Sequence, residues 1–168
     1  MEQKILLLGN PALYQVSTPV TKEDYLNLPK IVEDLHDTLM AFRKKYGAGR
    51  AIAAPQIGVP KRILYMHIDH PVVFLNPRLE FPDEEQMEVL DDCMSFPNLL
   101  VKVMRYRRCI IHYTDMEQRP CKMELSGDLA ELLQHEYDHL DGILAVMRSI
   151  NNESFFWKET PQKILNDK

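Results

Sequence analysis

The chain has 168 residues, of which 45% are hydrophobic and 27% charged, and its formal net charge is −5 at pH 7. This length predicts a single domain over residues 1–168. The negative net charge argues against a nucleic-acid-binding protein, because phosphate contacts need a surplus of Lys and Arg. No run approaches the roughly 20 apolar residues of a membrane span, so we expect no membrane partner.

The first half of the chain predicts an extended start followed by one helix. Residues 1–8 are too short for a signal peptide and predict a first strand or an extended segment that ends at Gly9-Asn10-Pro11. Residues 28–46 then carry apolar side chains at helical spacing, and their last turn is basic. Gly47 is expected to end this helix.

The second half predicts strands and then a second helix. Ser126 is the expected N-cap of that helix, and Gly142 is expected to end it. The aromatic tail residues 155–157 are expected to dock on the domain. The fold class is therefore α+β, with mainly antiparallel strands around a helix in the C-terminal half and a further helix near the N-terminus. The strands are expected at residues 62–68, 72–76, 99–104, 108–114 and 123–125.

The three cysteines argue against an oxidising compartment. Cys93, Cys109 and Cys121 are odd in number and form no C-x-x-C pair, so they do not predict a disulfide framework. Together with the missing targeting signal, this predicts a cytoplasmic protein.

Residues 135–139 read H-E-Y-D-H, which is the H-E-x-x-H pattern. Side chains four residues apart on a helix project from one face, so His135 and His139 can reach one metal ion. Glu136 lies beside them, placed to take a proton from a water molecule.

A catalytic metal needs a third protein ligand and one open position. A metzincin would have a histidine six residues after the second one, but Ala145 stands there. A thermolysin-like protease would use a glutamate on a later helix as the third ligand. The spacing from His139 to Glu159 matches that pattern, but the residues around Glu159 are poor helix formers, so the match is weak. A cysteine thiolate from elsewhere in the chain is the third candidate.

Three stretches of the chain resemble the peptide deformylase family, in the same order. Gln134–Gly142 is similar to the family's Q-H-E-x-D-H-L-x-G, and Asp91–Ser95 is similar to its E-G-C-L-S. Gly49–Gly58 resembles its G-x-G-L-A-A-P-Q-I-G loop. The resemblance covers essentially the whole chain and implies a deformylase-like fold.

The resemblance implies that Cys93 is the third metal ligand and that Glu136 is the general acid and base. It assigns the donors to the oxyanion to the Gln56 side chain and the Met94 backbone N–H. Asp138 is expected to bond a basic partner such as Arg105 and so stiffen the ligand helix. It also implies one divalent metal ion per chain, with Fe²⁺ favoured and Zn²⁺, Ni²⁺ or Co²⁺ as alternatives.

The implied reaction removes the formyl group from N-formylmethionyl peptides, at the N-terminus of a nascent chain. Transient ribosome contact would be the only link to nucleic acid. The resemblance places substrate contacts at Arg50, Ala51, Ile52, Asp92 and Leu132.

The chain departs from the family pattern where Ala51 and Asp92 replace two glycines and where Arg50 replaces an aliphatic residue. Glycine lets a peptide backbone approach closely. We therefore expect the Ala51 side chain to narrow the substrate pocket and the Arg50 and Asp92 side chains to add charge to it. The alternative function is therefore a deformylase-like metal-binding protein with an occluded pocket, which acts on a different amide or is not catalytic.

Overall fold

The computed structural model describes residues 1–167, so Lys168, the last residue of the predicted domain, lies outside the described residues. Residues 1–8 join neither sheet, so of the two expected forms the first strand was wrong. Their backbone is tied to the interior by the bonds from Leu6 N to Gln56 O at 2.8 Å and from Leu8 N to Ser95 O at 2.9 Å. Two 3₁₀ turns, η1 (Pro11–Tyr14) and η2 (Lys22–Leu26), follow.

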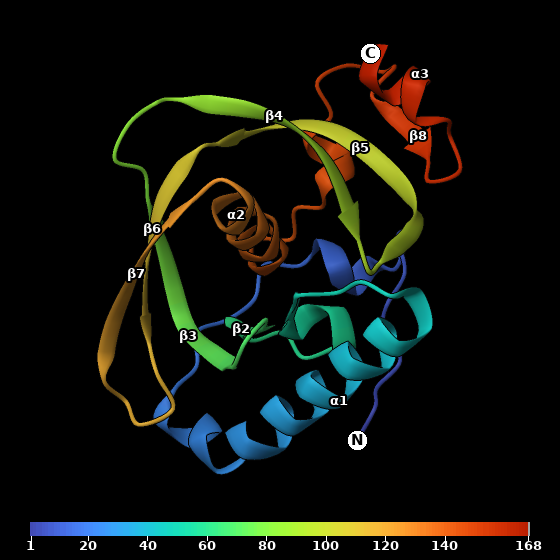
Figure 1. Ribbon diagram of the computed structural model, residues 1–168. Coiled ribbons are helices and arrows are strands. Elements are labelled where there is room, and N and C mark those ends of the chain that lie inside the picture. The colour runs from blue at the N-terminus through green and yellow to red at the C-terminus, as the bar shows by residue number, and fades with distance from the viewer. Residues whose placement is uncertain (168) are drawn as a thin grey trace.

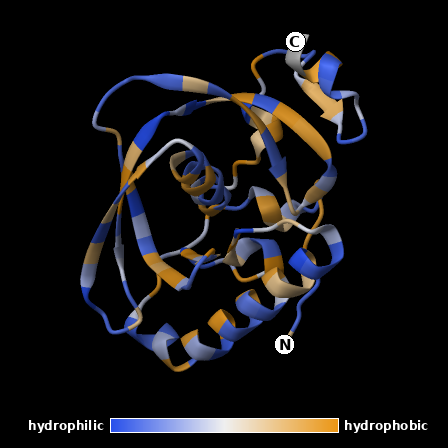
Figure 2. Ribbon diagram, in the orientation of Figure 1, coloured by the Kyte–Doolittle hydropathy of each residue, from blue (hydrophilic) through white to orange (hydrophobic). Residues whose placement is uncertain are grey.

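Helix α1 spans Leu28–Tyr46, the range that the apolar spacing predicts. It buries Leu28, Leu35 and Leu39 against the sheet and leaves the opposite face to solvent, which gives the alternating colours along this helix in Figure 2. Gly47 ends the helix in the left-handed region at φ 70°, with its N–H bonded to Arg43 O at 2.8 Å.

The larger sheet has five antiparallel strands in the order β1-β2-β3-β6-β7. Strand β1 lies at one edge of this sheet, where it pairs only with β2. The sequence predicted four of these strands and missed β1, which has only three residues. The bounds are β1 (Ala51–Ala53), β2 (Ile63–His67), β3 (Pro71–Glu80), β6 (Arg108–Thr114) and β7 (Pro120–Ser126).

A second sheet joins β4 (Gln86–Cys93), β5 (Phe96–Tyr106) and β8 (Phe155–Trp157) in that order. The β4–β5 hairpin arches over the molecule in Figure 1. Strand β4 was not predicted, because its acidic and half-exposed residues lack a clear β-rich run. The tail docks as an edge strand on β5, while Phe155 and Trp157 remain 41% and 66% exposed.

Helix α2 spans Asp128–Leu140 and lies between the two sheets, surrounded by strands in Figure 1. Nine of its thirteen residues are buried. Its N-cap is Gly127 at φ 60°, so the prediction of Ser126 was wrong: Ser126 is the last residue of β7 and pairs with Arg108. The chain turns sharply from strand to helix there, which favours glycine.

The chain after α2 passes close to its own beginning. Gly142 follows the helix at φ 72°, and a Cβ at this position would lie 2.4 Å from Tyr14 O, so only glycine fits. The remaining elements are the 3₁₀ turns η3 (Ala54–Ile57) and η4 (Ala145–Arg148) and the short helix α3 (Gln162–Asp167). Among the described helices, none has the length and apolarity needed to cross a bilayer.

Candidate metal centre and active site

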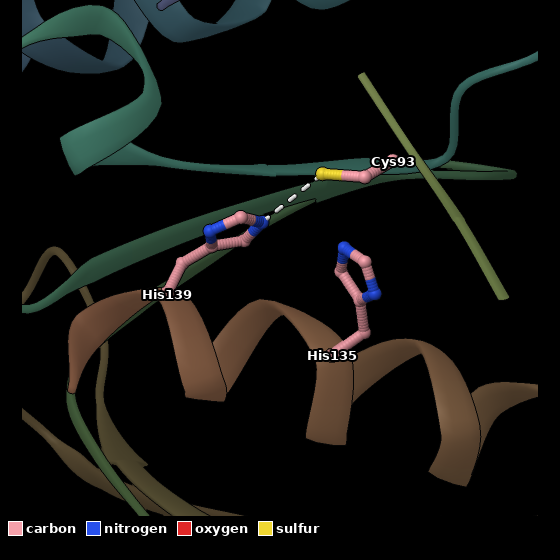
Figure 3. Close-up of side chains that lie close together, drawn as sticks. All are labelled: Cys93, His135 and His139. Carbon is pink, nitrogen blue, oxygen red and sulfur yellow. Dashed lines mark hydrogen bonds between the residues drawn. The ribbon is translucent and has the colours of Figure 1, made fainter. Parts of the chain in front are cut away.

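Three side chains from two elements meet in the interior between the sheets. Cys93 ends β4, and His135 and His139 project from one face of α2 toward it, as Figure 3 shows. Their ligand atoms lie within 4.8 Å of one another, and all three residues are buried. Cys93 Sγ is 3.3 Å from His139 Nε2. One thiolate and two imidazoles match a tetrahedral metal site that keeps an open position.

Asp91 orients the first of these histidines. Its carboxylate lies 3.0 Å from His135 Nδ1, which leaves the Nε2 atom of the ring for the metal. Burial lowers the pKa of His135, but the Asp91 carboxylate and Cys93 together outweigh that effect and raise it well above its ordinary value. Burial lowers the pKa of His139, which has no such partner, and the charge of His135 adds to the effect.

Behind the ligands lies a buried network of alternating charges. Arg105 donates to Asp91 at 2.8 Å and to Asp138 at 2.6 Å, so the expected Asp138–Arg105 ion pair is present. Arg148 from η4 adds a bidentate pair to the Asp138 carboxylate at 2.6 and 2.9 Å. This network ties β4, β5, η4 and α2 together at the level of the ligand helix.

Glu136 lies beside the ligands with one oxygen unsatisfied. The side chain is buried, and its Oε2 has no hydrogen-bond partner within residues 1–167. Burial raises the pKa of this carboxyl to about 7. A carboxyl group with such a pKa can both accept and release a proton near neutral pH.

Gln56 reaches the same centre from η3. Its Oε1 accepts from Ala53 N at 2.9 Å, which directs Nε2 toward Ser95 Oγ at 3.2 Å and Cys93 Sγ at 3.6 Å. Met94 follows the cysteine in the turn between β4 and β5, and its N–H donates to no acceptor in the described part of the chain. Gln56 Nε2 thus lies beside Cys93, and Met94 is its neighbour in sequence.

A pocket of about 220 Å³ opens onto Cys93, His135 and Glu136. Four of the five expected substrate contacts line it, namely Arg50, Ala51, Asp92 and Leu132. Ile52 does not: its side chain is fully buried in the core beneath α1, because side chains alternate along β1.

Arg43 holds the edge of this pocket. Its guanidinium donates to Gly49 O at 3.0 and 2.8 Å and to His67 O at 2.5 Å. Gly49 lies at φ 132°, and a Cβ there would press on Phe42 at 3.3 Å. The loop that carries Arg50 is thereby held between α1 and β2.

Several residues at the site escaped the sequence analysis. Glu131 lines the pocket one helical turn before His135, and the i, i+4 spacing could have revealed it. Lys158 also lines the pocket and pairs with Asp92 at 3.0 Å. Lys158 reaches the pocket because the preceding strand β8 pairs with β5. The residues near Lys158 in sequence do not indicate this pairing between distant segments.

Comparison with known proteins identifies the family of the chain. The family profile described as polypeptide deformylase matches residues 2–155. The chain belongs to the peptide deformylase family.

Curated relatives and solved structures of deformylases match over most of the chain. The peptide deformylase of Treponema pallidum (strain Nichols) is 37% identical over 148 residues, covering 86% of each protein. That of Rhizobium meliloti is 36% identical and covers 84% of this chain and 82% of the relative. The crystal structure of the Thermotoga maritima deformylase has a TM-score of 0.81 at 32% identity, covering 90% of this chain and 99% of that one.

A deformylase from Synechococcus elongatus, solved in complex with actinonin, gives a TM-score of 0.82 at 28% identity. It covers 90% of this chain and 80% of its own. Deformylases remove the formyl group from N-formylmethionyl peptides, and this chain is accordingly a hydrolase of the formyl amide.

Proposed function

We propose that Cys93, His135 and His139 hold one divalent transition metal and that Glu136 transfers the protons of deformylation. The observation that carries the proposal is the convergence of the three ligand atoms within 4.8 Å beside a buried carboxylate with an unpartnered oxygen. Such an oxygen is costly to bury unless a ligand or substrate completes its bonding.

The donor set indicates which metals fit. A mixed thiolate and imidazole site suits Fe²⁺, our first choice, and also accepts Zn²⁺, Ni²⁺ or Co²⁺. When bound, the ion supplies a Lewis acid that makes water nucleophilic near neutral pH. The motif-bearing helix α2 and the network through Asp91, Arg105 and Asp138 hold the ligands in place.

The chain's own groups carry the proton and charge movements. Glu136 accepts a proton from the attacking water and delivers it to the leaving amine. Gln56 Nε2 and the Met94 N–H donate to the formyl oxygen as negative charge develops on it. Removal of one such donor typically raises the barrier by about 2.7–4 kcal/mol.

The substrate peptide is proposed to lie along the free edge of β1. This strand pairs only with β2, so the backbone of residues 51–53 can pair with an extended peptide. Ile52 then contributes through its backbone alone, while Arg50, Asp92 and Leu132 face the first side chain. The Ala51 methyl group narrows the pocket without filling it.

We further propose that the chain works in the cytoplasm on nascent chains, in transient contact with the ribosome. Three free cysteines support the reducing compartment, and two of them are buried.

The test is anaerobic formate release from formyl-Met-Ala-Ser by protein loaded with Fe²⁺, with Glu136→Ala as the control. Turnover that disappears in the control, while the metal stays bound, supports the assignment. Stoichiometric metal without formate release by the wild type contradicts it and favours the alternative, a metal-binding protein with an occluded pocket.

A further inference from the structure

Ser95 lies between the thiol of Cys93 and the side-chain amide of Gln56. Its hydroxyl accepts from Gln56 Nε2 at 3.2 Å, and its backbone N–H donates to Cys93 Sγ at 3.4 Å. Ser95 and Gln56 are each 1% exposed, so bulk water does not compete for their contact. The serine therefore contacts both a proposed metal ligand and a proposed donor to the oxyanion.

The backbones of Gln56 and Ser95 are held by one segment near the start of the chain. Leu6 N–H donates to Gln56 O at 2.8 Å, and Leu8 N–H donates to Ser95 O at 2.9 Å. These two bonds tie the 3₁₀ turn η3 and the turn between β4 and β5 to the same short segment. With both backbones held, the orientation of the Gln56 amide depends on the hydrogen bonds of its own side chain.

The contact with Ala53 fixes which end of the Gln56 amide is the oxygen. A backbone N–H can only donate, and that of Ala53 lies 2.9 Å from Oε1. Nε2 is therefore the end beside Cys93, and it carries two N–H groups. One of them donates to Ser95 Oγ, which leaves the other for the side of Cys93, where the Nε2–Sγ distance is a longer 3.6 Å.

The Ser95 hydroxyl thus decides where the second N–H of Gln56 points. Within residues 1–167 it is the one oxygen that accepts from Nε2, so without it both N–H groups would be left with the Cys93 sulfur. The amide could then rotate away from the place proposed for the substrate oxygen. A displacement of about 1 Å in a catalytic group can lower the rate about a hundredfold.

We propose that Ser95 is a positioning residue that directs one N–H of Gln56 onto the oxyanion formed during deformylation. The inference rests on the proposed function, because it assumes that Gln56 donates to the formyl oxygen. The negative charge on that oxygen develops in the transition state, so the loss of the Ser95 hydroxyl should lower kcat and leave KM nearly unchanged.

The experiment is a double-mutant cycle of Ser95→Ala and Gln56→Leu, assayed anaerobically on formyl-Met-Ala-Ser with Fe²⁺-loaded protein. Gln56→Leu should lower kcat by about a hundredfold to a thousandfold, the usual effect of removing one oxyanion donor. Ser95→Ala alone should lower kcat by about tenfold to a hundredfold. In the Gln56→Leu background the same change should lower kcat by less than about twofold, because the group that it positions is already absent.

Two further measurements separate positioning from general damage. Ser95→Ala keeps the backbone N–H that donates to Cys93 Sγ, so its metal content and the visible spectrum of its Co²⁺-loaded form should match those of the wild type. Ser154→Ala is the matched control, because Ser154 is also a buried serine and its hydroxyl bonds to Asn151 near the tail. This variant should keep the kcat of the wild type.

The outcomes distinguish the inference from the proposed function. Full kcat in Ser95→Ala, together with a low kcat in Gln56→Leu, overturns the role of Ser95 alone. Equal effects of Ser95→Ala in both backgrounds, or loss of metal from this variant, also overturn it, since the serine then acts independently of Gln56. An undiminished kcat in Gln56→Leu overturns the proposed role of that amide, and the inference about Ser95 fails with it.

Discussion

The Asp91 carboxylate lies 3.0 Å from Nδ1 of His135 and thereby joins strand β4 to helix α2 at the candidate metal centre. Arg105 donates to the same carboxylate at 2.8 Å. Burial alone would raise the pKa of Asp91, but His135 and Arg105 outweigh that effect and hold it at about 2. The carboxylate is therefore ionised at neutral pH, where it accepts from Arg105 and orients the His135 ring.

Asp91 should make stability depend on pH in the acid range. Its pKa falls from 3.8 to about 2 on folding, so its contribution is complete above pH 3.8 and is lost as the pH falls toward 2. The contribution amounts to about 2 kcal/mol. Urea unfolding of metal-free wild type and Asp91→Asn should show a gap at pH 6 that narrows below pH 4. Asp92→Asn, an exposed neighbour, is the control, and a gap independent of pH would contradict this role.

Ionised Glu136 should lower the free energy of unfolding of the folded protein. Burial raises its pKa from 4.5 to about 7, so the folded chain holds this proton more tightly than the unfolded one. The free energy of unfolding should therefore fall as the pH rises from 4.5 through 7. Glu136→Gln removes this loss and should stabilise the metal-free protein by up to about 3 kcal/mol at pH 8, with no gain at pH 4.

The same Glu136→Gln protein should bind metal but release no formate. The exposed change Glu124→Gln provides the matched control, since it should alter neither unfolding nor turnover. Equal stabilisation by Glu136→Gln at pH 4 and pH 8 would show that packing, not ionisation, causes the effect.

Arg43 should act on substrate binding from outside the pocket. Its guanidinium holds the carbonyls of Gly49 and His67, and through them the loop that carries Arg50. Arg43→Ala should raise KM for formyl peptides by about tenfold, because several charge-assisted bonds are lost, while kcat changes little. Lys44→Ala, on the exposed side of α1, is the comparison. A fall in kcat with unchanged KM would place the effect at the chemical step instead.

Metal binding should depend on one cysteine of the three. Cys93→Ala should reduce metal content to near zero, whereas Cys109→Ala should keep it, because Cys109 is buried away from the centre and burial raises its pKa to about 11. Chelation of the wild type should lower its Tm, since a ligand that binds only the folded state stabilises it. An unchanged metal content in Cys93→Ala would remove this residue from the ligand set.

The sequence predicted the secondary-structure elements that are defined by a residue pattern within one continuous segment. The apolar spacing of residues 28–46 is long enough to define α1 to the residue, and the two histidines of α2 lie on one face by helical geometry alone. Ser126 was wrongly chosen as the N-cap, since a strand that runs directly into a helix needs the positive φ of Gly127.

The rest depends on contacts between distant segments. Strand β4 has no β-rich pattern of its own and is defined by its pairing with β5. Arg148 meets Asp138 only because η4 folds back beside the helix, and Lys158 reaches Asp92 only because the tail adds a strand to β5. The side chain of Ile52 lies outside the pocket because the short strand β1 directs it toward α1.

The meeting of Cys93 with the two helix histidines also sets an order of events during synthesis. The thiol emerges 42 residues before His135 and stays without its partners until α2 has been made and the two sheets have closed around it. Contacts this distant in sequence form late, after the hairpins. If Cys93, His135 and His139 hold the metal as proposed, the complete ligand set exists only after the chain has been made through α2 and β4 has packed beside that helix.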